Sequence, residues 1–184
     1  MLRAATVLAW SAAAVTAVLL SCGGSAHAGG TPQSAFHVDS NQSRNQVHYG
    51  VHIDARCHPE GDEPAYNYWL RLGHGDLPGT TRPLSFLQQV AYGFKTQRVR
   101  SDGRVEFRLR ALPERLFTIR TAPAPAAEGC KIETFVTIDS KEAFLDKVFV
   151  FADEGILLPE VRYIELSGHT NDGHAVYEKI NVAQ

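Results

Sequence analysis

The chain has 184 residues, with 18 Lys or Arg against 20 Asp or Glu, and its formal net charge is -2 at pH 7. Hydrophobic residues make up 44% and charged residues 21%, a balance that is typical of one globular domain and excludes a disordered tail or a collagen-like fibre. A basic surplus is absent, which argues against a dedicated nucleic-acid-binding protein, so we expect no nucleic-acid partner.

The first 28 residues have the pattern of a signal peptide. Arg3 precedes the mostly apolar run Ala4–Leu20, and small residues follow this run. The run is shorter than the about 20 apolar residues that a membrane-spanning helix needs. We therefore expect residues 1–28 to contain a signal peptide that directs export of the chain.

Two cleavage routes are consistent with this segment. Residues Leu19–Cys22 resemble a bacterial lipobox, in which Cys22 would receive lipid and anchor the protein on the periplasmic side of a membrane. Cleavage after Ala28, at an A-x-A site, would instead release a soluble periplasmic or secreted protein. In either case residues 29–35 are expected to form a flexible lead-in, and residues 36–184 a single β domain.

Both routes leave two cysteines in the folded part of the chain, Cys57 and Cys130. Two remaining cysteines in an exported domain favour one disulfide bond, because the compartment is oxidising. The alternative is a pair of unlinked buried thiols.

Alternation of apolar and polar residues with a period of two predicts a series of short strands. The expected strands are 47–53, 66–72, 93–100, 104–111, 116–120, 131–139, 145–152, 161–166 and 175–182. One short helix is expected before Gly93, capped by Thr81, with Leu84, Leu87 and Val90 on one face. The predicted fold is all-β, an antiparallel β-sandwich with one short helix, and an open barrel is the alternative.

A hairpin in the middle of the chain carries the most unusual local feature. With Ser101–Gly103 as a three-residue loop, Val99 and Val105 share one face, and Arg98 lies opposite Glu106. The solvent face then carries a strip of five arginines, Arg98, Arg100, Arg104, Arg108 and Arg110. Such a strip could bind an anionic envelope polymer or a lipid headgroup through bidentate contacts, and the alternative is an ordinary solvated strand face.

Other residue patterns give little support for catalysis. His48 and His52 share a strand face and are weak metal-ligand candidates, but four residues along a strand span about 13 Å, too far for one ion. We find no catalytic or cofactor-binding motif, so catalytic residues remain unassigned and no cofactor is predicted. Tyr66 and Tyr68 are expected to pack inward, and Trp69 to point the other way.

Three segments occur in an order that resembles a known family. They are residues 36–45 (FHVDSNQSRN), 64–69 (PAYNYW) and 87–94 (LQQVAYGF). Together they resemble the bacterial family of domains of unknown function numbered 4833, over a span from Phe36 to Asn181. The resemblance implies an exported envelope protein with no assigned activity, so it transfers no catalytic residue. Family-specific features are expected in the segments from Ser40 to Asn45 and from Ala91 to Gly93.

These observations predict a non-enzymatic binding or structural module of the cell envelope. Its expected partners are a membrane, through the lipid anchor, and an envelope protein or anionic glycan. The alternative function is a metal-assisted hydrolase that uses the strand histidines.

Overall fold

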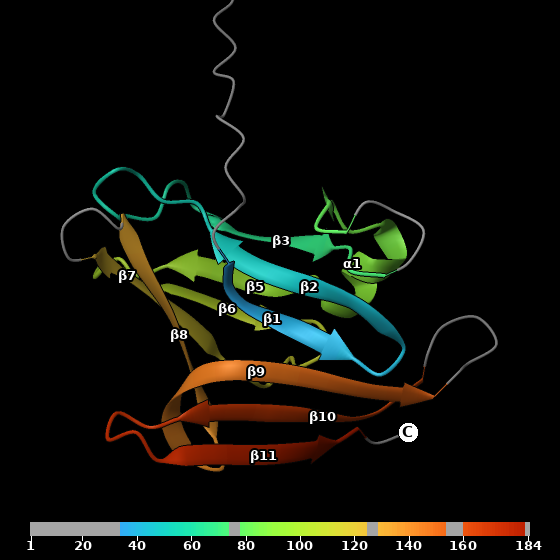
Figure 1. Ribbon diagram of the computed structural model, residues 1–184. Helices are drawn as coiled ribbons and strands as arrows, with labels where there is room; N and C mark the ends of the chain where they lie inside the picture. Colours follow the sequence, from blue (N-terminus) through green and yellow to red (C-terminus); the bar gives the residue numbers. More distant parts are fainter. Residues whose placement is uncertain (1–33, 74–77, 125–128, 154–159, 183–184) are drawn as a thin grey trace, which may run out of the picture. The chain divides into compact units, whose positions relative to one another are not determined.

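The structure is a computed structural model that describes residues 34–73, 78–124, 129–153 and 160–182 (Figure 1). The predicted signal peptide and lipidation at Cys22 lie outside the described residues. No helix in the described part of the chain is long and apolar enough to cross a membrane.

The described residues form eleven strands and one short helix. In chain order these are β1 (Ser34–Ser40), β2 (Ser43–Val51), β3 (Ala65–Leu70), β4 (Thr81–Arg82), α1 (Phe86–Tyr92), β5 (Phe94–Val99), β6 (Val105–Leu109), β7 (Phe117–Pro123), β8 (Cys130–Ile138), β9 (Lys141–Asp153), β10 (Glu160–His169) and β11 (Ala175–Asn181). The prediction of an all-β fold with one short helix is confirmed.

A single sheet connects all of these strands, with β9 at its branch point. The main path runs β4-β3-β2-β1-β9-β8-β7-β6-β5, and β10 and β11 extend from the other edge of β9. The first part of β9, from Lys141 to Phe144, pairs with β8, whereas Val148–Val150 pair with β1 in parallel. The sheet is therefore mixed and continuous, whereas the sequence predicted only antiparallel pairing.

The sheet folds over on itself, so that β1 and β2 pack against β6 and β7 (Figure 1). Phe36 in β1 stacks on Tyr49 in β2, with ring centroids 4.6 Å apart, and contacts Phe107 in β6 and Phe117 in β7 at 6.2 and 5.8 Å. All four side chains are buried. This aromatic stack joins the two layers and forms the centre of the core.

Strand β1 begins at Ser34, inside the segment that was expected to be a flexible lead-in. Its backbone pairs with β2 on one side and β9 on the other. Phe36 and Val38 point into the core. Only these two apolar residues alternate before the polar residues Asp39 and Ser40, which is why the strand was not predicted.

The β5–β6 hairpin has the predicted register. Arg98 lies opposite Glu106, and Val99 opposite Val105. Gly103 closes the turn with a φ of 80°, a left-handed conformation that costs glycine little.

Helix α1 differs from its prediction at the start and in its packing. Thr81 belongs to β4, and Ser85 caps the helix instead, because its hydroxyl accepts a hydrogen bond from the Gln88 backbone while the Gln88 side chain accepts one from the Ser85 backbone. Leu84 is buried before the helix begins. Leu87 and Val90 are 56% and 50% exposed, so the expected apolar face does not contribute to the core.

The predicted disulfide is present in the structure. Cys57 and Cys130 are bonded, with their Cα atoms 5.5 Å apart. The bond ties the β2–β3 connection to the start of β8 across 73 residues of sequence.

Removing this disulfide with the Cys57→Ala/Cys130→Ala double variant should lower the free energy of unfolding by about 4 kcal/mol, because the unfolded chain loses a constraint on a long loop. Urea denaturation under oxidising conditions measures this loss. Reductant should destabilise the wild type and leave the double variant unchanged. Equal stability of the two proteins without reductant would contradict the expectation.

Candidate functional site

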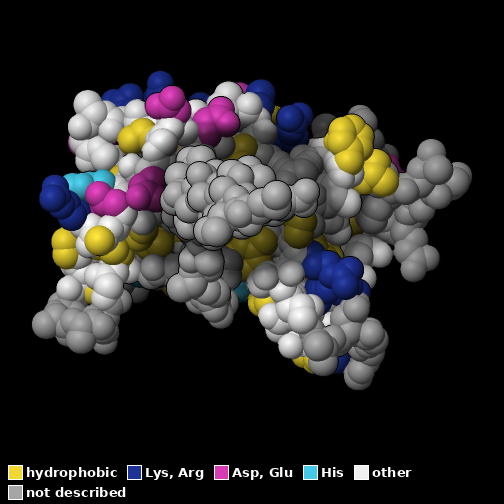
Figure 2. Space-filling model, turned by 90° about the horizontal axis from the view of Figure 1, so that it is seen from above, with side chains coloured by type: hydrophobic (Ala, Val, Ile, Leu, Met, Phe, Trp, Pro, Cys, Tyr) yellow, Lys and Arg dark blue, Asp and Glu magenta, His cyan; other side chains and the backbone are white. Residues whose placement is uncertain are grey.

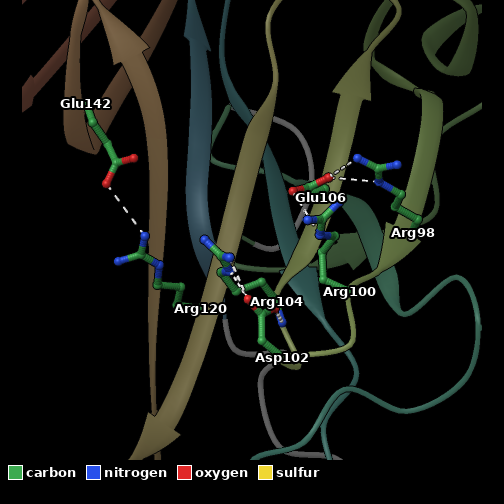
Figure 3. Close-up of polar contacts among 7 residues, drawn as sticks. All are labelled: Arg98, Arg100, Asp102, Arg104, Glu106, Arg120 and Glu142. Atoms are coloured by element: carbon green, nitrogen blue, oxygen red, sulfur yellow. Dashed lines mark hydrogen bonds and ion pairs between the residues drawn. The ribbon is translucent and has the colours of Figure 1, made fainter.

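The strongest cluster of charged side chains lies on the outer face of β5, β6 and β7 (Figure 3). We call it the arginine face, and its members are Arg98, Arg100, Arg104, Arg108 and Arg120. The first four were predicted from the sequence, and Arg120 is added from β7. The predicted fifth member, Arg110, is exposed just beyond the end of β6.

Glu106 organises one end of this face. The Arg98 guanidinium donates two hydrogen bonds to its carboxylate, at 2.8 and 2.5 Å, and Arg100 approaches the other carboxylate oxygen at 3.6 Å. The Glu106 side chain is only 11% exposed, whereas those of Arg98 and Arg100 are 63% and 46% exposed. One sheltered carboxylate thus holds two guanidinium groups that remain open to solvent.

Arg104 and Arg120 form the other end. The Arg104 guanidinium donates to Asp102 at 2.7 Å, and this hydrogen bond is the main cause that lowers the pKa of the Asp102 carboxyl group below its usual value. Arg120 lies 4.0 Å above the Phe135 ring and 3.5 Å from Glu142. Arg120 and Glu142 are distant in sequence, so only the fold could identify this pair.

A groove opens between these strands. It has a volume of about 370 Å³ and is lined by Thr96, Gln97, Arg98, Glu106, Arg108 and Leu116. Arg108 donates to the Pro113 carbonyl oxygen at 3.1 Å, which directs its side chain along the groove wall. The lining therefore offers hydroxyl and guanidinium donors, a carboxylate acceptor and a partly exposed apolar side chain, Leu116.

The face retains a positive surplus despite its ion pairs. It has five arginines against three carboxylates, those of Asp102, Glu106 and Glu142. A guanidinium has five N–H donors and uses only one or two of them in hydrogen bonds to a carboxylate. The internal ion pairs therefore fix the arginine side chains while leaving donors available to an anionic ligand.

The histidine candidates lie on a different surface, the outer face of β1, β2 and β3. His48 Nε2 is 2.9 Å from the Gln46 side-chain oxygen, and His48 Nδ1 is 2.9 Å from the Ser34 hydroxyl. Gln46 in turn donates to Asp39 at 2.9 Å, which orients its amide so that its oxygen accepts from His48 Nε2. Both ring nitrogens of His48 are thus engaged within the protein.

His52 does not join His48 in a site. Its ring packs against Tyr66, with centroids 4.4 Å apart. Within the described residues, no group of three His, Cys, Asp or Glu side chains is arranged to hold a metal ion.

The aromatic residues in β3 face the opposite way from the prediction, although Tyr68 is buried as expected, with 8% of its surface exposed. Strand β2 sets the faces, because inward-facing Val47 pairs with Trp69, and outward-facing His48 pairs with Tyr68. Trp69 therefore packs against the core, and Tyr68 stacks on His48 at 5.2 Å. Aromatic residues occur on both faces of this strand, so their alternation alone could not distinguish the inner face from the outer.

The segments expected to carry family-specific features serve the scaffold. The Asn41 side chain both donates to and accepts from the backbone of Ala152 at 2.9 Å, joining the β1–β2 turn to β9. The Asn45 side-chain oxygen accepts from the backbone of Leu72 and Gly73, at 2.8 and 2.9 Å. These contacts account for both asparagines without a ligand.

Residues 36–179 match a family described as "Domain of unknown function (DUF4833)". No curated protein and no solved structure matches the chain.

The pH dependence of stability tests the histidine network. Burial lowers the pKa of His48 below its usual value, and the neighbouring His37 adds to the effect. The unfolded chain therefore takes up a proton at a higher pH than the native one, so His48 makes the protein less stable as the pH falls below about 6.5. In the His48→Asn variant the loss of stability between pH 7 and pH 5 should be smaller, as measured by urea midpoints.

His174→Asn is the matched control, since the His174 side chain is 82% exposed. An unchanged pH profile in His48→Asn, or the same change in both variants, would show that the buried network does not cause the acid sensitivity.

Proposed function

Because the chain belongs to the DUF4833 family, a domain of unknown function, we propose its role from its geometry: it is a non-enzymatic binding module of the cell envelope whose arginine face binds an anionic glycan. The observation that carries this proposal is the sheltered Glu106, which holds Arg98 and Arg100 beside an open groove. Side chains that are already held in place lose less conformational entropy when a ligand binds.

The composition of the groove favours a sugar over a bare anion. A sugar ring has hydroxyl groups that both donate and accept hydrogen bonds, and Glu106 and Thr96 can serve these groups. The carboxylate of an acidic sugar can pair bidentately with a guanidinium such as Arg108. Leu116 supplies an apolar contact for the face of the ring. The groove thus offers a partner for the hydroxyl groups, the carboxylate and the ring face of an acidic polysaccharide.

Immobilised alginate, a polymer of uronic acids, provides the binding test. Arg98→Gln/Arg108→Gln should bind alginate at least about tenfold more weakly than the wild type, because it removes two charged donors from the groove wall. The matched control is Arg162→Gln/Lys179→Gln, which removes two positive charges from β10 and β11. Biolayer interferometry at fixed ionic strength measures both variants.

The control should retain wild-type affinity, and neutral dextran should not bind any of the proteins. If both double variants lost affinity equally, only net charge would matter, and the groove would not be the binding site. Equal binding to alginate and dextran would contradict recognition of the anionic group.

We further propose that the protein is exported and anchored by lipid at Cys22. The sequence of residues 1–28 supports this proposal, and the disulfide between Cys57 and Cys130 is consistent with an oxidising compartment. A lipid anchor would hold the arginine face near the polymers of the envelope.

Intact-mass analysis of the processed protein tests the anchor. We expect a chain that starts at Cys22 and carries the added mass of its acyl groups, and Cys22→Ser should remove that mass and release the protein from membranes. An unmodified chain that starts at Gly29 would overturn the lipid anchor and leave export by the second route.

A further inference from the structure

Helix α1 presents three large apolar side chains to solvent. Phe86 is 81% exposed, Leu87 56% and Val90 50%, and none of the helix residues is buried. Residues three and four apart share a helix face, so Phe86 and Leu87 both lie beside Val90. We call these three residues the α1 patch. Single exposed apolar residues are ordinary, but three adjoining ones on one short helix indicate a surface that binds a partner.

Hydrogen bonds and the partly buried Tyr92 side chain hold this helix against the sheet. The Tyr92 carbonyl oxygen accepts from the Tyr49 hydroxyl at 2.7 Å and from the Asn67 side chain at 3.2 Å. The Gln89 side chain donates to the Asn67 side-chain oxygen at 3.1 Å. At the other end, the Ser85 capping box closes the first turn. Gln89 and Tyr92 therefore contact the protein, and Phe86, Leu87 and Val90 face outward.

The charged residues that neighbour the patch in the sequence are all basic. Between Leu77 and Ser101 the sequence has no acidic residue, whereas Arg82 and Lys95 flank the helix on either side. Both side chains are exposed. Arg110 adds a third cation nearby, since its backbone N–H donates to the Gly93 carbonyl oxygen at 2.9 Å. Seen from above, hydrophobic side chains gather at the end of the domain that carries α1, with Lys and Arg side chains beside them (Figure 2).

We propose that the α1 patch inserts into the headgroup region of an anionic lipid bilayer. Apolar side chains on a short exposed helix, together with flanking cations, match the boundary between acyl chains and negatively charged headgroups. A protein partner fits less well, because three side chains offer far less than the ~800 Å² per partner of a standard protein interface. The inference is independent of glycan binding, since it rests on different side chains.

This contact would also define how the domain sits on a membrane. Helix α1 joins directly to β5, and Thr96 near the start of β5 lies opposite Arg108 in the wall of the glycan groove. Insertion of the patch would therefore bring one end of the arginine face close to the lipid surface. The two surfaces remain separable by mutation.

Hydrogen–deuterium exchange of the full chain, read by mass spectrometry, tests the insertion locally. Vesicles of phosphatidylcholine with phosphatidylglycerol should slow exchange of the amides in residues 86–95 at least about fivefold, and vesicles of phosphatidylcholine alone should slow it less. Phe86→Ser/Leu87→Ser/Val90→Ser should abolish this protection. The apolar run at residues 4–20 is the same in every variant, so attachment through the N-terminus does not affect the comparison.

Tyr177→Ser is the control variant, because Tyr177 is 54% exposed on β11, away from α1 in sequence and in strand order. It should keep full protection of residues 86–95. Core amides in β6 should exchange alike in all variants, which checks that each is folded. Absence of protection with both vesicles, or equal protection in the triple variant, would overturn the inference. Protection that needs no vesicles and rises with protein concentration would identify a second copy as the partner and also overturn it.

Discussion

The whole arrangement depends on strand β9, which belongs to both layers of the folded sheet. Its first residues pair with β8, and Val148–Val150 pair in parallel with β1, while β10 lines its other edge. The sheet folds over at this strand (Figure 1), and Phe36 of β1 packs against Phe107 and Phe117 of the opposite layer. Burial of these rings stabilises the centre of the core, and the outer faces carry other chemistry.

Each outer surface has its own chemical character. The β5–β7 layer carries arginines held by a sheltered carboxylate, and the β1–β3 surface carries a closed network in which His48 is tied to Ser34 and Gln46. Helix α1 exposes apolar side chains instead. Both ring nitrogens of His48 form contacts within the protein, whereas each guanidinium of the arginine face has N–H donors that its carboxylate partner does not use. The arginine face is therefore better suited to a ligand than the histidines.

Features set by neighbouring residues could be predicted from the sequence, and features set by distant ones could not. The β5–β6 register followed from Val99, Val105 and Gly103, which are close together, and the disulfide followed from counting cysteines. The parallel pairing of β1 with β9 joins segments more than a hundred residues apart and leaves no local signal. The outward Tyr68 and inward Trp69 depend on the register with β2. The exposure of Leu87 could not be predicted either, because the sequence pattern of an apolar helix face is the same whether that face is buried or exposed.

The arginine strip itself was visible in the sequence, but its organisation was not. The pairing of Arg98 with Glu106 was predictable, whereas the groove and the Arg120–Glu142 pair required the fold. Chemical-shift mapping with a trisaccharide of uronic acid tests whether the groove on the arginine face binds an anionic glycan. Backbone amide shifts should be confined to Thr96–Arg98, Glu106–Arg108 and Leu116. Shifts confined to β10 and β11, or none at millimolar trisaccharide, would contradict binding in the groove.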